Sequence, residues 1–293
     1  MKFLLTLLLF VSISSGQTPD DLHSWVRGIE GRDPQGRREF VKKELDKLGV
    51  AYTTEPFSRT GRFGNRERTI TGENIVVTTG AGTKSIVVGA HLDAVPGSPG
   101  ANDNGGGVAV LLGLVRWSAS VPWNHRVRFC FFDQEEMGLI GSQEFVKTYA
   151  DSSAHLAMIN LDVEGMGEAV YVGPVGGGDD DLIMPVVRTA AGKLKVPFFE
   201  SEHYPPSDHR SFGRRGLENI SVSVVPSADV PLLIEAVAGG WQLNPDRMPE
   251  VMKFMHTPRD SAVYVSKDAL DLSFRFMKAI LARLNALGTT GPR

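Results

Sequence analysis

The stretch SIVVGAHLDAVPGSPGANDNGGG, residues 85–107, joins an apolar run to a polar loop that ends in three glycines. The run at 85–90 is typical of a buried strand, because strands that are covered on both faces are apolar throughout. A helix is expected to follow at 107–117. This order of strand, loop and helix is the repeating unit of an α/β fold.

The same alternation continues on both sides of this stretch. Apolar runs at 127–132, 156–161 and 220–225 predict further strands, and helical periodicity predicts helices at 142–149, 181–193 and 266–287. Strands that alternate with helices favour a parallel sheet with helices on both faces. We therefore expect one domain of class α/β, a three-layer α/β/α arrangement around a mixed, mainly parallel central sheet.

Other segments are less regular. Residues 20–49 have helical spacing and predict one helix, whose basic cluster Arg37, Arg38, Lys42 and Lys43 we interpret as a solvated face. Residues 50–80 predict short strands with turns. The acidic GGGDDD segment at 176–181 is expected to be a loop, and 226–255 shows no clear elements.

Composition excludes several classes of protein. The 293 residues include 31 Lys and Arg against 34 Asp and Glu, with 42% hydrophobic residues. This balance excludes wholesale disorder and lacks the basic surplus of a protein that coats nucleic acid. A single cysteine, Cys130, excludes a disulfide scaffold and a cysteine-rich zinc site.

The N-terminus has the features of a secretory signal. Lys2 precedes an apolar stretch at 3–13, and the small residues at 14–16 suit cleavage before Gln17. No later apolar stretch is long enough for a membrane span. We therefore predict a signal peptide at 1–16, a catalytic domain at 17–293, and a secreted or periplasmic location.

Metal-type ligands follow three of the predicted strands. They are His91 and Asp93 after the first, Glu135 and Glu136 after the second, and Asp162 after the third. Asp103 precedes the helix at 107–117. Ligands of α/β sheets bind beyond the carboxyl ends of the strands, so these side chains are expected at one edge of the sheet.

These residue types suit a divalent metal centre. Imidazole and carboxylate ligands together are typical of zinc, and a pair of cations needs an anionic ligand between them. One of Glu135 and Glu136 can stay off the metal as a proton acceptor. Asp93 can accept a hydrogen bond from the imidazole of His91 and select its tautomer.

Five stretches resemble the co-catalytic di-zinc aminopeptidase family, which includes secreted leucyl aminopeptidases and glutamate carboxypeptidases. They are GAHLDAVPGSPGANDNGGGVA, FFDQEEMGLIGSQEF, INLDVEGMG, YPPSDHRSFGRRG and HTPRDSA, in the order of the family. Departures are the run GGG after Asn104, where Gly-Ser-Gly is more usual, the Val163–Glu164 pair after Asp162, and the absence of a disulfide near Tyr204. Glu164 is expected either to reach the substrate amine or to be solvated.

The resemblance implies a zinc exopeptidase that holds two Zn²⁺ ions per chain and acts on peptides as a monomer, without nucleic-acid or membrane partners. By matched position it implies five metal ligands and three residues that act with them. The ligands are His91, Asp103, Glu136, Asp162 and His256. Glu135 is the implied general base, Asp93 orients His91, and Tyr204 helps to stabilise the oxyanion.

Alternative functions remain open at this point. Arg210, Arg214 and Arg215 would suit a dipeptidase or carboxypeptidase of the same family if they bound a substrate carboxylate. A glutaminyl-cyclase-like acyl transferase would need one zinc ion. Aminoacylase-like hydrolases are disfavoured by the short spacing of Asp93 and Asp103, and a non-catalytic ectodomain by the complete ligand set. An apolar specificity pocket is expected from Trp241, Leu243, Met248, Met252, Phe254 and Met255.

Overall fold

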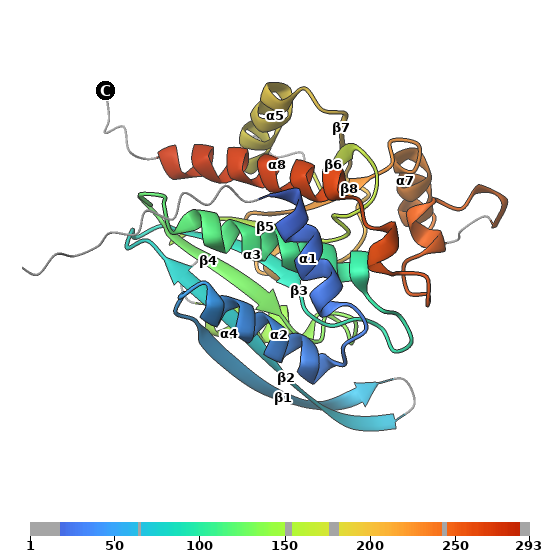
Figure 1. The fold of residues 1–293 in the computed structure, drawn as a ribbon, viewed down its shortest axis with the longest axis horizontal. Coiled ribbons are helices and arrows are strands. Elements are labelled where there is room, and N and C mark those ends of the chain that lie inside the picture. The colour runs from blue at the N-terminus through green and yellow to red at the C-terminus, as the bar shows by residue number, and fades with distance from the viewer. Residues whose placement is uncertain (1–17, 64–65, 150–153, 176–181, 242–244, 288–293) are drawn as a thin grey trace, which may run out of the picture.

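A computed structural model describes residues 18–63, 66–149, 154–175, 182–241 and 245–287. The predicted signal peptide at 1–16 and the acidic loop at 176–181 lie outside these ranges. One eight-stranded sheet has the order β1-β2-β4-β3-β5-β8-β6-β7. Four of its strand pairs are parallel and three are antiparallel, which confirms the mixed, mainly parallel α/β architecture (Figure 1).

The predicted strands form the middle of the sheet. They are β3 (Ser85–His91), β4 (Arg126–Phe132), β5 (His155–Leu161) and β8 (Asn219–Val225). The remaining strands are β1 (Thr53–Phe63), β2 (Arg66–Thr79), β6 (Ala169–Gly173) and β7 (Phe198–Glu200).

Helices cover both faces of the sheet. One face packs against α1 (Pro19–Ile29), α2 (Pro34–Lys47), α3 (Gly107–Ser118), α5 (Ile183–Leu194) and α8 (Lys267–Ala286). The other face packs against α4 (Ile140–Thr148) and α6 (His209–Gly213). Side chains alternate between the two cores, since Ile86 and Val88 belong to the first and Val87 to the second.

The N-terminal segment differs from the prediction of one helix. It breaks between Ile29 and Pro34, because Asp33 accepts a hydrogen bond from the Gly36 amide at 2.6 Å and begins a new helix with Pro34 in its first turn. The expected solvated face is also wrong for Arg37, which is 1% exposed.

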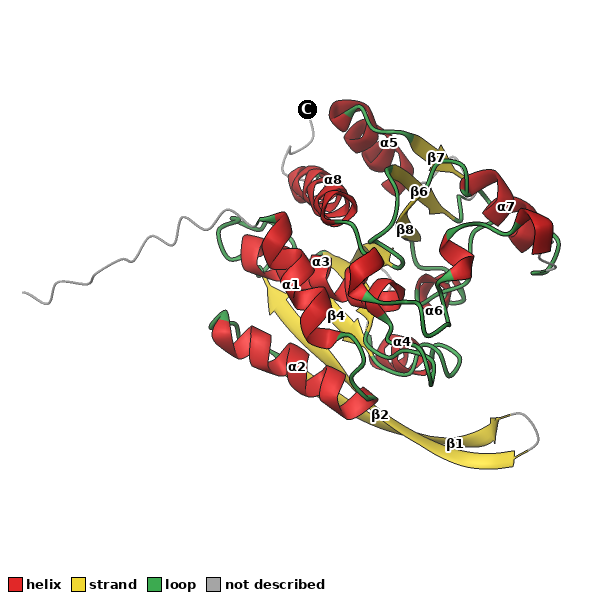
Figure 2. Ribbon diagram, turned by 45° about the vertical axis from the view of Figure 1, so that its right-hand side comes forward, coloured by secondary structure: helices red, strands yellow, loops and turns green. Residues whose placement is uncertain are grey.

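Residues 50–80 form one long hairpin rather than several short strands. β1 pairs with β2 from Thr53 to Phe63, whereas β4 pairs only with the part of β2 from Ile75 to Thr79. The other half of the hairpin therefore extends beyond the remaining strands of the sheet (Figure 2).

The register of the central strands aligns their carboxyl ends. His91 of β3 is paired with Phe132 of β4, and Ala90 with Leu161 of β5. The residues after these ends therefore meet at one edge, as predicted. None of the helices in the described ranges has the length and apolar character to cross a membrane.

Candidate metal centre and active site

His91 lies at the centre of the first ligand group. It is the last residue of β3, and its Nε2 lies 3.1 Å from Asp103 Oδ1 and 3.5 Å from Asp162 Oδ1. The imidazole is 1% exposed. Potential ligand atoms of these three residues lie within 4.8 Å of one another, close enough to hold one metal ion.

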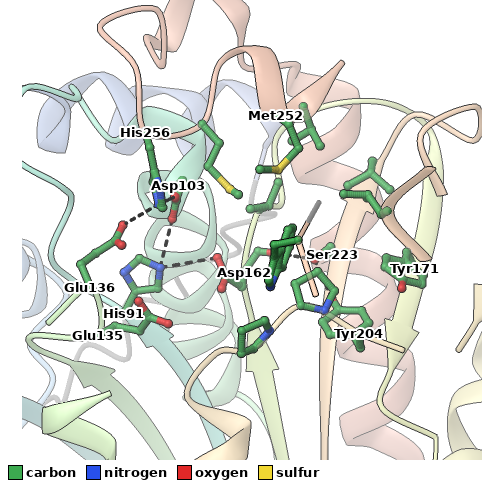
Figure 3. A pocket seen from close by; sticks show the side chains of 18 residues that line it. His91, Asp103, Glu135, Glu136, Asp162, Tyr171, Tyr204, Ser223, Met252 and His256 are labelled. Atoms are coloured by element: carbon green, nitrogen blue, oxygen red, sulfur yellow. Dashed lines mark hydrogen bonds and ion pairs between the residues drawn. The ribbon is translucent and has the colours of Figure 1, made fainter. Parts of the chain in front are cut away.

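The second group shares Asp103 with the first. Asp103 Oδ2 lies 3.0 Å from His256 Nε2, and that nitrogen lies 3.3 Å from Glu136 Oε1 (Figure 3). Each carboxylate oxygen of Asp103 therefore faces a different histidine. This is the arrangement in which one carboxylate can bridge two cations.

Asp93 organises both sides of the first group. Its backbone carbonyl lies 3.2 Å from His91 Nδ1, and a carbonyl can only accept, so Nδ1 carries the proton and Nε2 is free as a ligand. Its carboxylate accepts the backbone amides of Glu135 at 2.9 Å and Glu136 at 3.1 Å. The expected tautomer is thus set by the carbonyl, while the carboxylate holds the Glu135–Glu136 turn.

The loop that carries Asp103 is fixed by buried polar contacts. It forms a kinked turn, η1 (Ala101–Gly106), in which Asp103 and Asn104 have non-helical dihedral angles, and Asn104 donates to the Leu161 carbonyl at 2.8 Å. Asn104 also accepts the Gly107 amide at 3.1 Å, and a Cβ at Gly107 would lie 2.2 Å from this side chain. The third glycine therefore provides room for the contact between the loop and β5.

Asp260 supports the same loop from the C-terminal side. Its carboxylate accepts the amides of Asn102 at 2.7 Å and Asp103 at 3.1 Å. Sequence reasoning did not assign a role to Asn104 or Asp260. Their positions inside ANDNGGG and HTPRDSA were the available signal.

Burial and neighbouring charges shift the pKa values of several side chains at the site. Burial would raise the pKa of Asp103, but hydrogen bonds from His256 and His91 outweigh it and lower the pKa. The close approach of His256 to the Asp103 and Glu136 carboxylates raises the pKa of its imidazole to about 10. Burial raises the pKa of Glu135 well above its usual value, and nearby carboxylates add to the effect.

The donor set fits a pair of divalent cations. Asp162 Oδ1 and Glu136 Oε1 are buried, and within the described part of the chain neither has a hydrogen-bond partner. Each lies within ion-pair range of a histidine. Four carboxylates, of Asp103, Glu135, Glu136 and Asp162, converge on two imidazoles. Such an excess of buried acceptors is costly unless a cation compensates it.

A cavity of about 420 Å³ opens beside this cluster. Tyr171, Tyr204 and Met252 lie on its side away from the cluster (Figure 3), and its lining also includes the apolar side chains of Leu233 and Val251. Trp241 and Met255 also line the cavity, as predicted, whereas Met248 and Phe254 do not. Leu243 lies outside the described residues.

Tyr204 occupies the wall of the cavity. Its hydroxyl lies 2.6 Å from Ser223 Oγ, and Ser223 in turn donates to the Asp162 carbonyl at 2.5 Å. Because the Ser223 hydroxyl donates its only proton to the Asp162 carbonyl, it accepts the hydrogen bond from the Tyr204 hydroxyl. The phenol is therefore linked to the backbone of Asp162.

Two other expectations have definite outcomes. Glu164 is fully buried, and its Oε1 accepts the Asp162 amide at 3.2 Å, so it is neither solvated nor part of the cavity lining. Arg210, Arg214 and Arg215 are exposed and do not line the cavity.

Comparison with known proteins places this site in a family. Residues 74–281 match the family described as Peptidase family M28. The chain belongs to peptidase family M28. Aminopeptidase YwaD of Bacillus subtilis is 30% identical over 191 residues, which are 63% of this chain and 38% of that protein. The probable lipoprotein aminopeptidase LpqL of Mycobacterium tuberculosis is 43% identical over 158 residues, 51% of this chain and 32% of that protein.

The fold is shared with solved structures over nearly the whole chain. A zinc aminopeptidase from Bacillus subtilis superposes with a TM-score of 0.73 and 17% identity, covering 91% of this chain and 95% of its own. Porphyromonas gingivalis glutaminyl cyclase superposes with a TM-score of 0.71 and 19% identity, covering 91% and 98%. These likenesses show the shared fold, while the chain spans about two fifths or less of the length of the two M28 relatives named above.

Proposed function

We propose that this M28 protein is a zinc-dependent aminopeptidase that hydrolyses N-terminal peptide bonds. The observation that carries the proposal is Asp103, whose two oxygens face His91 and His256 at 3.1 and 3.0 Å beside an apolar cavity. The names of the M28 relatives support aminopeptidase activity.

Two zinc ions would share the Asp103 carboxylate. His91 and Asp162 would complete one site, and Glu136 and His256 the other. Both sets offer the nitrogen and oxygen donors that zinc prefers. Zinc held there would supply Lewis acidity that polarises the scissile carbonyl and favours deprotonation of the attacking water.

Glu135 would move the proton. The Asp93 carboxylate fixes its backbone amide, and burial keeps the affinity of its carboxylate for a proton high. A carboxylate of this kind can take the proton of the attacking water and pass it to the leaving amine. His91 stays in the tautomer that Asp93 selects.

The cavity would select the N-terminal residue of the substrate. A free substrate amine is attracted by the carboxylates, while the first side chain would enter the apolar wall that includes Met252 and Trp241. Tyr204, beside Ser223, would donate a hydrogen bond to the oxyanion only after exchanging its present acceptor.

Export to the periplasm or the medium would follow from the predicted signal at 1–16. The name of the relative LpqL, a probable lipoprotein aminopeptidase, is compatible with such a location. A monomeric state is part of the same proposal.

One purified sample tests the proposal. Elemental analysis should give two zinc ions per chain, and a panel of dipeptides should be cleaved when the N-terminus is free and the C-terminus blocked. N-blocked dipeptides should be inert. Cleavage of only N-blocked substrates would favour a carboxypeptidase, and cyclisation of N-terminal glutamine with one zinc ion would favour the acyl transferase.

A further inference from the structure

Arg37 is a buried cation that contacts the loop between two candidate metal ligands, His91 and Asp103. It lies on α2 and is 1% exposed, which is rare for an arginine. Its guanidinium donates to the carbonyl of Leu92 through Nε, to Pro99 at 3.2 Å through Nη1, and to Gly100 at 3.0 Å through Nη2. The first acceptor is at the start of the loop at 92–100, and the other two are at its end.

These carbonyls belong to the segments that deliver two ligands. Leu92 stands between His91 and Asp93, and Gly100 directly precedes η1 with Asp103. The guanidinium is planar, so its donors keep fixed directions relative to one another. One rigid group therefore fixes the start of the loop relative to its end.

Gly100 permits the close approach of the Arg37 guanidinium to the loop. Gly100 has a φ of 64°, and a Cβ there would lie 3.0 Å from Arg37 Nη1. The Pro99 carbonyl also accepts the Gly31 amide at 2.8 Å, which ties the loop to the turn between α1 and α2. We call these contacts of Arg37 with Leu92, Pro99 and Gly100 the Arg37 clamp. The clamp connects the N-terminal helices to the segments that carry His91 and Asp103.

The positive charge of Arg37 is compensated by carboxylates that it does not contact through a hydrogen bond. All its hydrogen bonds that the structure resolves go to backbone carbonyls, so its charge is compensated over a longer range. Asp93, Asp103, Asp260 and Glu136 all interact with it electrostatically. Loss of the positive charge alone would strengthen the binding of a cation, because it removes electrostatic repulsion. Loss of the hydrogen bonds would weaken cation binding, because the ligand segments would no longer be held in place.

We propose that Arg37 is a positioning residue that fixes His91 relative to Asp103 and thereby sets the metal affinity of the site. This inference rests on the proposed zinc site. Arg37 does not line the cavity and therefore acts on the substrate only through the two ligands. Its clamp should affect metal binding and kcat far more than KM.

The test compares Arg37→Met and Arg37→Lys with Leu45→Ala in the zinc-loaded protein. Leu45 lies on the same helix, is fully buried in the apolar core, and controls for lost stability. Zinc affinity is measured by competition with a chelator, and kcat and KM at saturating zinc. We expect about 10- to 100-fold weaker zinc binding for Arg37→Met, the usual range for groups that orient ligands. KM should change less than about 2-fold on the same reasoning.

Arg37→Lys keeps the charge without the planar fork, so it should also lose zinc affinity. Leu45→Ala should lower Tm and leave zinc affinity unchanged. Hydrogen exchange of the metal-free proteins provides a readout besides activity. Amides at 98–104 should exchange faster in both Arg37 variants than in Leu45→Ala.

The positioning role is overturned if Arg37→Met binds zinc as tightly as Leu45→Ala does, or more tightly than the wild type. In that case a wild type that binds zinc and cleaves dipeptides leaves the proposed function intact. A wild type that binds no zinc overturns the proposed function instead, and exchange at 98–104 then decides alone whether Arg37 fixes the loop. If Arg37→Met does not fold, Arg37→Lys carries the same comparison.

Discussion

The Asp260 carboxylate receives the backbone amide of Asp103 at 3.1 Å, although 157 residues separate the two. Asp260 also accepts the Asn102 amide at 2.7 Å. The segment that carries His256 therefore supports the loop that carries Asp103. Because the two potential ligands are held by one hydrogen-bonded unit, a shift of either segment displaces both.

Replacing Asp260 by Asn tests this link. The side-chain NH₂ of Asn would face the backbone N–H of either Asn102 or Asp103, and both groups are donors. That backbone N–H would then be buried without an acceptor. We expect a loss of about 1–3 kcal/mol in the free energy of unfolding and at least ~10-fold weaker zinc binding. Urea unfolding and chelator competition measure the two effects.

Asp229→Asn is the matched control for Asp260→Asn. Asp229 is buried and accepts the amides of Glu250 and Val251, both at 2.8 Å, in the same double arrangement. The Asp229→Asn substitution should lower the free energy of unfolding and leave the zinc affinity unchanged. Equal zinc affinities in the two variants would remove the special role of Asp260.

The strands and their end residues were accessible from the sequence for a physical reason. Apolar runs identify buried parallel strands, and parallel strands end at the same edge of a sheet, so His91, Glu135 and Asp162 were expected to converge. His256 could be added only through its resemblance motif, since the sequence predicts no regular element before it.

Arg37 and Asp260 could not be assigned in this way. Helical spacing placed Arg37 among charged residues, whereas in the structure its guanidinium is buried against the carbonyls of the loop at 92–100. Contacts of this kind depend on three-dimensional packing between segments far apart in the chain. The break in the N-terminal helix was predictable, since Asp33 and Pro34 form a common helix start.

Glu135→Gln separates proton transfer from metal binding. Gln has nearly the same shape, but its amide cannot accept the proton from water. The variant should keep its zinc and lose at least ~10²-fold in kcat. Glu144→Gln on α4, which removes a carboxylate paired with Lys147, serves as a control and should leave kcat unchanged. A fully active Glu135→Gln enzyme would exclude this role.

His256→Ala tests the number of metal ions. His256 belongs to the group with Asp103 and Glu136 but not to the group around His91, so zinc content should fall from two ions to one. His203 is the control, because its side chain is 48% exposed, close to the 49% of His256, and lies outside both groups. Retention of two ions in His256→Ala would contradict the assignment.

The wall of the cavity should control substrate preference. Met252 lines the cavity, whereas the similarly half-buried Met248 does not. Met252→Ala should lower kcat/KM for an N-terminal Leu substrate by about 10-fold relative to one with Ala, since a lost apolar contact is worth about 1–3 kcal/mol. Met248→Ala should keep the original ratio. The pocket assignment fails if both variants change the ratio equally.

His209 should make the fold sensitive to acid. It is 1% exposed, its Nδ1 has no hydrogen-bond partner among the described residues, and burial lowers its pKa to about 3. In the unfolded chain the imidazole takes up a proton below pH ~6.5, whereas the folded protein keeps it neutral down to about pH 3. The unfolded state therefore binds more protons, and stability falls as the pH drops through this window.

His209→Leu removes this contribution. From pH 7 to pH 5 the wild type should lose about 2 kcal/mol more than the variant, since each pH unit below 6.5 costs about 1.4 kcal/mol. Urea unfolding of both proteins in the presence of a chelator measures the difference without interference from metal release. The pKa of neighbouring Asp208, raised to about 7 by burial, affects both proteins and cancels in the comparison. Parallel stability curves would show that His209 is already protonated in the folded protein at pH 5.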